Sequence, residues 1–329
     1  MNRRDFLHGT TLAGASALLG IRPGLAGAEP PPETPRLRLP RYPFDVACTA
    51  PQWVAEDLLK AEGFSIVEYV TTPLATDALA AGELDLIVAD APGIILRLDA
   101  GKPIVVLAGI HGGCYELFAS DRVRSILDLK GKTVAAANVA RRAFVGSMAA
   151  YVGRDPGRDG SFGMPEGGQA MQLFVEGKAD AFLGFPPEPQ ELRAKRIGHT
   201  VVSTAVDRPW SQYFCCMAIG NRDFVRRNPV ATKRALRALV KATDLCAADP
   251  ERVVSSLVER GFLKNRDYSL QALREIPYRR WREYDSADTI RFYALRMHEA
   301  GVIKSSPQRL IADGTDWRFV NELKKELKG

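Results

Sequence analysis

Short apolar runs alternate with longer helical patterns from Phe44 onward, and this alternation most restricts the folds open to the chain. The short runs predict strands at 44–50, 65–71, 84–90 and 103–110. The longer patterns predict helices at 52–62, 76–81 and 94–100. Because strands separated by helices of about ten residues form βαβ units, this part is expected to build a mainly parallel sheet.

The pattern restarts near residue 126 and later becomes helical. Further strands are predicted at 131–137, 179–185, 200–206 and 213–220, with helices at 126–130, 142–152 and 169–176. Beyond Asn228 the pattern predicts mostly helices, at 230–247, 250–260, 270–276 and 286–300. The predicted fold class is α/β, with a second lobe inserted into the first and a helical C-terminal section packed on lobe one.

Length and charge exclude several classes of protein. The 329 residues suffice for two lobes of about 150 residues each. The net charge of +6, from 45 Lys and Arg against 39 Asp and Glu, comes without a dense basic block, so no nucleic-acid partner is expected. No apolar run reaches the roughly 18 residues that a membrane-spanning helix needs. A soluble, mildly basic protein is predicted.

The first 28 residues contain the parts of an export signal in order. Arg3 and Arg4 precede the weakly apolar stretch 10–21, and Ala26 and Ala28 stand as in an A-x-A cleavage motif. The paired arginines indicate a twin-arginine signal, so the twin-arginine export machinery is a predicted partner. Cleavage after Ala28 would leave a periplasmic protein; the alternative is a cytoplasmic protein with a frayed basic start.

A proline-rich stretch follows the signal. Six prolines within residues 29–43 predict an extended, poorly ordered lead-in. The folded part is therefore expected to begin near Tyr42.

Three segments together resemble a known family. They are A-L-A-A-G-E-L-D-L-I-V-A-D-A-P with the following A-G-K-P-I-V-V-L-A-G-I, S-I-L-D-L-K-G-K-T-V-A at 125–135, and A-M-Q-L-F-V-E-G-K-A-D-A-F-L-G-F at 170–185. In this order and spacing the chain is similar to the periplasmic solute-binding proteins of ABC importers, of the nitrate/sulfonate/taurine and thiamine-pyrimidine type, over roughly residues 44–263.

The resemblance implies a type II periplasmic-binding-protein fold. Two lobes, joined by two crossover strands, would close by hinge motion on a solute in the cleft. Lobe one would comprise residues 44–115 and 216–329, with the C-terminal helices, and lobe two residues 116–215. In open α/β sheets, ligands bind at the carboxyl ends of strands, where helix N-termini point at them.

Five candidate ligand-binding residues lie after strand ends in lobe one: Gln52, Trp53, Asp90, Ala91 and His111. Trp53 is expected either to stack on a planar ligand or to pack in the core. Asp90 is expected either to pair with a cationic or amide-bearing ligand or to cap the helix that starts near Gly93. His111 could donate to the solute, although a lone histidine is more often structural.

Seven further candidates belong to lobe two and the return crossover: Asn138, Arg141, Arg142, Phe185, Glu188, Trp210 and Tyr213. By the family pattern, the helix N-terminus near Asn138 cradles an anionic group of the ligand. Arg141 or Arg142 would grip a carboxylate, sulfonate or phosphonate, unless both arginines lie on the solvated surface. Phe185 is a stacking candidate and Glu188 a second acidic contact. The remaining two aromatic residues would wall the cleft or pack between the lobes.

The five cysteines are Cys48, Cys114, Cys215, Cys216 and Cys246. An odd number leaves at least one thiol free or paired between molecules. Cys114 could form a disulfide with either Cys215 or Cys216 across the crossovers, but buried free thiols are the preferred interpretation. A site of His111, Cys114 and Cys215 would suit a soft metal. The histidines are nevertheless widely scattered, so no metal and no cofactor are predicted.

The sequence contains no catalytic motif, so the predicted protein is not an enzyme. The leading hypothesis is the substrate-binding component of an ABC importer, a monomer that delivers a small anionic or zwitterionic organic solute, aromatic ones included. Its partners would be the ABC permease and its ATPase. One alternative is a cofactor- or metal-containing enzyme related to thiamine-pyrimidine synthases. The other is a periplasmic ligand sensor that presents its closed state to a signalling protein.

Overall fold

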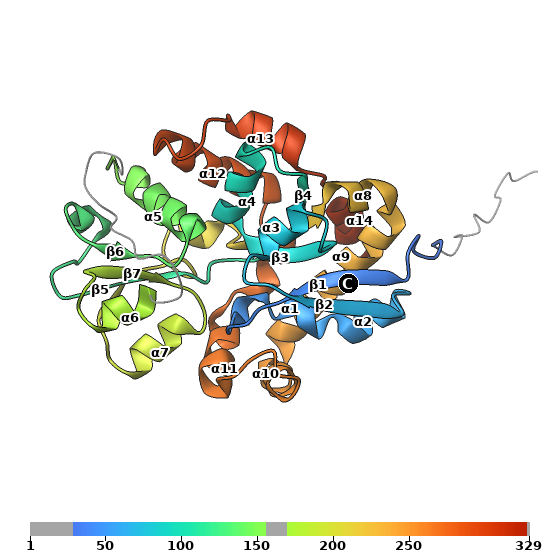
Figure 1. The fold of residues 1–329 in the computed structure, drawn as a ribbon, viewed down its shortest axis with the longest axis horizontal. Helices are drawn as coiled ribbons and strands as arrows, with labels where there is room; N and C mark the ends of the chain where they lie inside the picture. The colour runs from blue at the N-terminus through green and yellow to red at the C-terminus, as the bar shows by residue number, and fades with distance from the viewer. Residues whose placement is uncertain (1–28, 156–169, 328–329) are drawn as a thin grey trace, which may run out of the picture. The chain divides into compact units, whose positions relative to one another are not determined.

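The strands form two groups, and the chain passes between the groups twice (Figure 1). The computed structural model describes residues 29–155 and 170–327, and the chain from Pro32 onward makes up one unit by its internal contacts. The predicted export signal, residues 1–28, lies outside the described residues.

The first group contains five strands: β1 (Arg36–Arg41), β2 (Ile66–Thr71), β3 (Leu86–Asp90), β4 (Ile104–His111) and β9 (Cys216–Asn221). Strand β1 pairs in parallel with β2, and β9 lies between β3 and β4, antiparallel to both. The backbone N–H of Asp85 donates to the Arg38 carbonyl at 3.0 Å, so β1 also lies beside the start of β3.

The second group is a four-stranded sheet in the order β6-β7-β5-β8. Its strands are β5 (Glu116–Ala119), β6 (Val134–Ala135), β7 (Ala181–Gly184) and β8 (His199–Ser203). Strand β5 is antiparallel to both β7 and β8, whereas β6 is parallel to β7. Figure 1 shows α5 on one side of this sheet and α6 and α7 on the other.

The helices follow the predicted alternation and fill the C-terminal part. Those before β9 are α1 (Pro51–Val54), α2 (Glu56–Ala61), α3 (Ala75–Ala80), α4 (Ala91–Asp99), α5 (Val139–Tyr151), α6 (Ala170–Val175) and α7 (Glu188–Ala194). Those after β9 are α8 (Arg222–Arg227), α9 (Pro229–Ala248), α10 (Pro250–Glu259), α11 (Arg266–Glu275), α12 (Ser286–Glu299), α13 (Pro307–Gly314) and α14 (Arg318–Glu326). Short 3-10 turns are η1 (Ala47–Thr49), η2 (Ile126–Leu129), η3 (Trp210–Gln212) and η4 (Tyr278–Arg282). Within 29–155 and 170–327, no helix is long and apolar enough to cross a membrane.

The expectation of mainly parallel strands is wrong for the described strands. Four pairings are antiparallel, β3–β9, β4–β9, β5–β7 and β5–β8, and two are parallel. The chain leaves the first group after β4, and β9 brings it back in the opposite direction between two strands that were already parallel. Hydrophobic periodicity carries no information on strand direction, so the sequence pattern could not reveal this return.

The proline-rich segment is not a poorly ordered lead-in throughout, because β1 occupies Arg36–Arg41. Leu37 and Leu39 are fully buried there, while Arg36 and Arg38, which alternate with them, are more exposed. The R-L-R-L alternation is a period-two strand pattern, and the surrounding prolines concealed it. The fold therefore starts before Tyr42.

The strand predicted at 44–50 is also absent. The chain forms η1 (Ala47–Thr49) and then α1, which begins at Pro51. Proline is well tolerated in the first turn of a helix, since the N–H that it lacks has no partner within the helix. Apart from the exposed Phe44, the apolar residues of this segment are buried just before α1, where a short apolar run looks the same as in a strand.

Two links join the strand groups, residues 112–115 after β4 and residues 204–215 before β9. They are hydrogen-bonded to each other: the Thr204 N–H donates to the Tyr115 carbonyl and the Tyr115 N–H to Thr204 Oγ1, both at 2.9 Å. A Cβ on Gly113 would stand 1.8 Å from the Thr204 carbonyl oxygen, so only glycine permits this close approach. The two links between the strand groups therefore lie side by side in close backbone contact.

Candidate functional site

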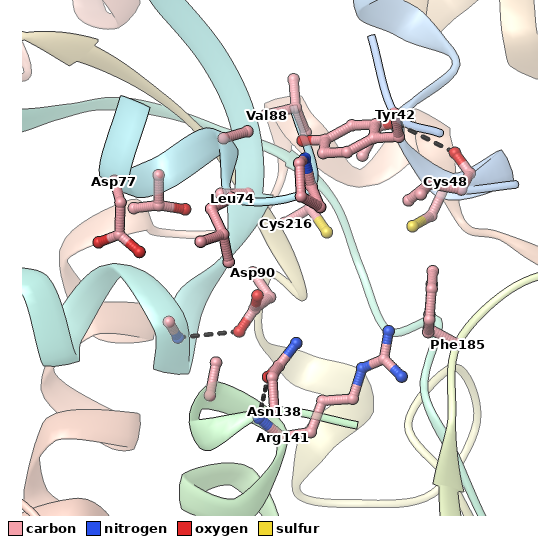
Figure 2. A pocket seen from close by; sticks show the side chains of 18 of the residues that line it. Tyr42, Cys48, Leu74, Asp77, Val88, Asp90, Asn138, Arg141, Phe185 and Cys216 are labelled. Carbon is pink, nitrogen blue, oxygen red and sulfur yellow. Dashed lines mark hydrogen bonds between the residues drawn. The ribbon is translucent and has the colours of Figure 1, made fainter. Parts of the chain in front are cut away.

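A pocket with a volume of about 190 Å³ lies where residues of both strand groups meet (Figure 2). One wall comes from the segments near Tyr42, Leu74 and Asp90, at the ends of β1, β2 and β3. The facing wall comes from the first turn of α5 and from Phe185, which directly follows β7. The pocket therefore lies at the carboxyl ends of strands, the position expected for a ligand site in an α/β protein.

Helix α5 carries the basic group of the pocket. Asn138 is its N-cap, and the Asn138 side chain accepts the Arg141 backbone N–H at 3.0 Å. The Arg141 side chain then extends toward Phe185, as Figure 2 shows, and the guanidinium carbon lies 3.6 Å from the centre of that ring. Only 8% of the Arg141 side chain is exposed. Helix capping and a cation–π contact thus hold one arginine at the pocket.

The Arg141 guanidinium is incompletely satisfied. Its nearest carboxylate is Glu188, with 3.7 Å between Nη1 and Oε2, which is too long for a hydrogen bond. Among the described residues, neither Nε nor Nη1 of Arg141 has a hydrogen-bond partner. A buried guanidinium in this state costs free energy unless an acceptor fills the space beside it.

Two partly buried carboxyl groups border the pocket region. Asp90 is the N-cap of α4 and accepts the Gly93 N–H at 2.8 Å; burial raises the Asp90 pKa, while Arg141 and Arg97 act to lower it. Glu188 accepts the Phe185 N–H at 3.0 Å, and burial also raises its pKa against the attraction of Arg141. Asp90 therefore caps α4, which is one of its two predicted roles, and it also lines the pocket; its pairing with a ligand stays a prediction.

Aromatic rings line much of the remaining surface. Phe44 meets Phe185 edge-on with ring centres 6.5 Å apart, and Tyr42 lies 5.8 Å from Phe44. Burial raises the pKa of Tyr42 and Tyr115 well above the usual range, so both hydroxyls stay neutral. A ring or an apolar chain of a solute could contact this surface.

Four of the predicted site residues line the pocket: Asp90, Asn138, Arg141 and Phe185. Glu188 accepts the Phe185 N–H but does not line the pocket, and Ala91 is buried with its N–H bonded to the Cys215 carbonyl at 2.9 Å. Arg142, the neighbour of Arg141, does not line the pocket. Of the two adjacent arginines, Arg141 is therefore the one that faces it.

The other candidates lie in the protein interior or at distant contacts. Gln52 is fully buried and accepts the Val88 N–H at 3.0 Å. Trp53 donates to the Pro40 carbonyl and stacks on Phe262. Of its two predicted roles, stacking on a ligand or packing in the core, it therefore takes the second.

The aromatic candidates of the return link pack elsewhere. Trp210 meets Tyr151 edge-on at 5.2 Å, and Tyr213 stacks on Phe292 at 4.1 Å. Neither lines this pocket.

Sequence analysis missed most of the wall to which Asp90 belongs. The sequence pattern places Tyr42 in the poorly ordered lead-in and Phe44 in a strand, and it gives Asp77 and Arg97 no role beyond their helices. Arg97 Nη2 lies 2.8 Å from Asp77 Oδ2, so this second arginine of the wall is paired with a carboxylate. The loop after β2, with Leu74, carries no motif that would identify it.

A cluster of thiols and one imidazole lies at the base of the pocket. Ligand atoms of Cys48, His111, Cys114 and Cys216 all lie within 4.8 Å of one another, and all four residues are buried. Cys215 adds a fourth sulfur, 3.1 Å from that of Cys114. All five cysteines, which fall within the described residues, are free thiols. Cys48 and Cys216 also line the pocket, so the two features share a wall.

Comparison with known proteins identifies relatives of this architecture. The model of the family described as "NMT1/THI5 like" matches residues 59–253, more than half of the chain. Among curated proteins, no sequence matches the chain.

Solved structures match most of the chain at low sequence identity. The periplasmic nitrate-binding protein NrtA from Synechocystis PCC 6803 has a TM-score of 0.75 and 17% identity, over 91% of this chain and 90% of that one. The alkanesulfonate-binding protein SsuA from Xanthomonas axonopodis pv. citri, bound to MOPS, has 0.69 and 17%, over 88% and 99%. The aliphatic sulphonate binding protein SsuA from Escherichia coli has 0.64 and 15%, over 84% and 91%. The fold is therefore the α/β fold of periplasmic binding proteins, and these three neighbours are binding proteins rather than enzymes.

Proposed function

Because the chain belongs to the NMT1/THI5-like family and its pocket ends on a buried guanidinium, we propose that it is the substrate-binding component of an ABC importer. The solute is small and anionic or zwitterionic, and the aromatic wall also accepts a ring. Capture of this kind needs no chemical step, only a higher affinity for the closed conformation than for the open one.

The observation that carries the proposal is the unsatisfied state of Arg141. Its Nε and Nη1 donors have no hydrogen-bond partner among the described residues, although the side chain is 8% exposed. A carboxylate or sulfonate offers two or more oxygens in the geometry that a guanidinium fork recognises. The N-terminus of α5, a helix of 13 residues, adds the favourable end of a helix dipole.

The opposite wall supports a solute with a second, cationic end. Asp90 lies there with its carboxylate already accepting the Gly93 N–H, and Asp77 is paired with Arg97. A bare anion would meet repulsion from Asp90, whereas an amino group next to it would be attracted. A zwitterion therefore suits both walls better than a simple anion does.

The neighbours supply a consistent class of solute. NrtA is described as nitrate-binding, and the two SsuA proteins as binding alkanesulfonates or aliphatic sulphonates. Nitrate and sulfonates are oxyanions, the class that a free guanidinium binds. We carry over this class, and not any one solute, to the present chain.

The two strand groups would move as two lobes around the paired links. We retain lobe two as residues 116–215 and extend lobe one to begin at Arg36 rather than at 44, because β1 is part of its strand group. Hydrogen bonds already span the two sides, among them those from the Ala47 N–H to the Pro186 carbonyl at 3.2 Å and from Gln190 Nε2 to Glu275 Oε2 at 2.8 Å. Hinge closure of the lobes over the solute would create the surface that an ABC permease and its ATPase recognise.

The cellular setting follows from the same role. A monomer, exported through the twin-arginine machinery with the signal removed near Ala28, would work in the periplasm, where its permease collects the solute.

Substitution of Arg141 tests the proposal. Thermal shift with nitrate, taurine, MOPS, benzoate and a neutral pyrimidine would identify solutes that raise the melting temperature with the logarithm of their concentration. For the best of these probes, Arg141→Gln is expected to weaken binding roughly 10- to 100-fold, because hydrogen bonds to a charged partner are lost.

The matched control is Arg142→Gln, which removes the same charge one residue away and outside the pocket. It should leave binding within about twofold, measured by calorimetry. Equal losses of solute affinity in both variants would mean that Arg141 acts only through its charge and not through direct hydrogen bonds to the solute. Absence of a response to every oxyanion probe would overturn the assignment of the solute class.

A further inference from the structure

The cysteine–histidine cluster at the base of the pocket has no role in solute capture by Arg141. Its donor atoms are three sulfurs and one imidazole nitrogen, and tetrahedral sites with such donors bind zinc or copper(I). We propose that one thiophilic d¹⁰ cation, Zn²⁺ or Cu⁺, binds there to Cys48, His111, Cys114 and Cys216. This inference stands on residues other than those that carry the solute proposal.

Strand pairing brings two of the ligands together. In the register of β4 against β9, His111 is the direct partner of Cys216. Cys114 follows three residues after His111, on the first link, and the Cys215 N–H donates to the His111 carbonyl at 3.0 Å. These contacts fix the backbone on both sides of the site before any ion binds.

The fourth ligand, Cys48, comes from η1 near the start of the fold. The Tyr278 hydroxyl lies 3.3 Å from the Cys48 carbonyl and donates to it, and the Tyr278 ring packs edge-on against His111, with ring centres 5.3 Å apart. A single buried tyrosine thus positions two ligands at once. Such supporting contacts are a regular property of metal sites.

His111 is prepared for coordination through one particular nitrogen. Its Nδ1 lies 2.6 Å from the Gly112 carbonyl oxygen, which can only accept, so Nδ1 carries the proton. The lone pair is therefore on Nε2. That atom is buried and has no hydrogen-bond partner within the part of the chain that the structure describes. A buried, unpaired acceptor facing thiols is the arrangement that an ion would complete.

The spacing of the donors suits one ion. In a tetrahedral site with metal–sulfur bonds of about 2.3 Å, neighbouring donor atoms stand roughly 3.5 to 3.8 Å apart. The four donors here lie within 4.8 Å of one another, so small side-chain rotations suffice. Cys215, although its sulfur is 3.1 Å from that of Cys114, is outside this set of four.

Binding changes the protonation of the cluster in a defined way. The three thiols each lose a proton to solvent as their sulfurs bond to the ion, while neutral His111 gives only its lone pair. No electron is transferred, and no other reactant is needed. Because Cys48 and Cys216 line the pocket, both the ion and the released protons have a path to solvent.

Metal titration of the full chain tests the proposal. Protein stripped of metal by a chelator and reduced under argon would be titrated with Zn²⁺ and with Cu⁺ in competition with a chromophoric chelator. We expect one ion per chain for the better of the two metals. Substitution with Co²⁺ should give thiolate-to-metal charge transfer and the intense visible bands of a tetrahedral site.

Variants of the cysteines identify the ligands. Cys48→Ser and Cys216→Ser should each lower the affinity for the ion by more than about 100-fold, beyond the usual effect of losing a supporting contact. Cys246→Ser makes the same chemical change at a buried cysteine outside the cluster and should bind as the unmodified chain does. Arg141→Gln should also bind the ion normally, which separates this inference from the solute proposal.

Three results would overturn the proposal. They are no stoichiometric binding of either metal by the reduced chain, a cobalt spectrum without thiolate charge transfer, or equal affinity in Cys216→Ser and Cys246→Ser. If the protein is isolated with a disulfide between Cys114 and Cys215, binding after reduction supports the site and its absence refutes it. The cobalt spectrum of the unmodified chain decides the question even if a variant fails to fold.

Discussion

Asp90 combines a partly buried carboxylate with a helix cap at the edge of the pocket. The Gly93 N–H stabilises its charged form, yet burial dominates and raises the Asp90 pKa above the ordinary value of 3.8. A group whose pKa is raised on folding favours the native state at low pH and costs stability once it ionises. The wild-type chain therefore carries a penalty at neutral pH that it lacks in acid.

Asp90→Asn should remove this penalty while keeping the cap, because asparagine also accepts from a helix N–H. The variant is expected to be more stable than the wild type at pH 7, by about 1.4 kcal/mol for each unit by which the Asp90 pKa is raised. The advantage should shrink as the pH falls through the raised pKa and vanish below 3.8. Urea unfolding across this pH range measures it. A less stable variant at pH 7 would contradict the stated cause of the shift.

Some residues of the pocket could be predicted from the sequence, and others could not. Asp90, Asn138 and Phe185 could be predicted because each follows a strand end that the periodicity reveals. Arg141 and Arg142 could not be told apart, since successive residues on a helix point about 100° apart and the helix start was misplaced by three residues, at Arg142 instead of Val139. Trp53 and Gln52 occupy equivalent positions after a predicted strand, but no strand forms there and both are buried.

At the scale of the element, β1 depends on two leucines within a proline-rich segment. Leu37 and Leu39 are fully buried, whereas 57% of the Arg36 side chain is exposed. The composition of this segment indicated a poorly ordered lead-in, because a short segment with many prolines is typical of an extended linker. The alternation of leucine and arginine predicts a strand, which is correct. It spans only four residues, however, so the proline content of the segment favoured the prediction of a lead-in.

Leu39→Ala is expected to lower the free energy of unfolding by about 2–5 kcal/mol, the cost of a cavity in a packed core. Chemical denaturation measures the loss. Arg36→Ala, in the same strand, removes only an exposed ion pair with Glu68 and should cost less than about 1 kcal/mol. Equal, small effects of both substitutions would mean that β1 is dispensable and that the fold starts near Tyr42 after all.

At the scale of the whole molecule, the paired links carry both connections between the strand groups. They are bonded through Thr204 and Tyr115, and Gly113 allows them to touch. The sequence indicated where the chain leaves and returns, from the glycines after β4 and the strand at 213–220. The sequence also suggested His111 and Cys114 as ligands of a soft metal, together with Cys215. It could not indicate that Cys48 and Cys216 complete the cluster instead, because these residues lie far from His111 in the chain and follow no spacing motif. The pairing of β4 with β9 brings His111 and Cys216 together, and η1 contributes Cys48.

Gly113→Ala should destabilise the protein by about 1–3 kcal/mol or more, because the new Cβ meets backbone that cannot rotate away. Thermal unfolding provides the measurement. Gly131→Ala is the comparison: its Cβ would meet nothing within 4 Å among the described residues, and its φ of +69° costs about 1 kcal/mol. If the two variants have the same melting temperature, the links are looser than their contacts imply.

The shared wall of pocket and cluster gives the protein a built-in reporter. Cys48 and Cys216 face the space that a solute would fill, so a bound solute shields their sulfurs from small reagents. The rate at which a thiol-directed alkylating agent modifies the reduced, metal-free chain then measures the fraction of molecules whose pocket is empty. Occupancy can be followed in this way without a label and without knowledge of which solute is bound.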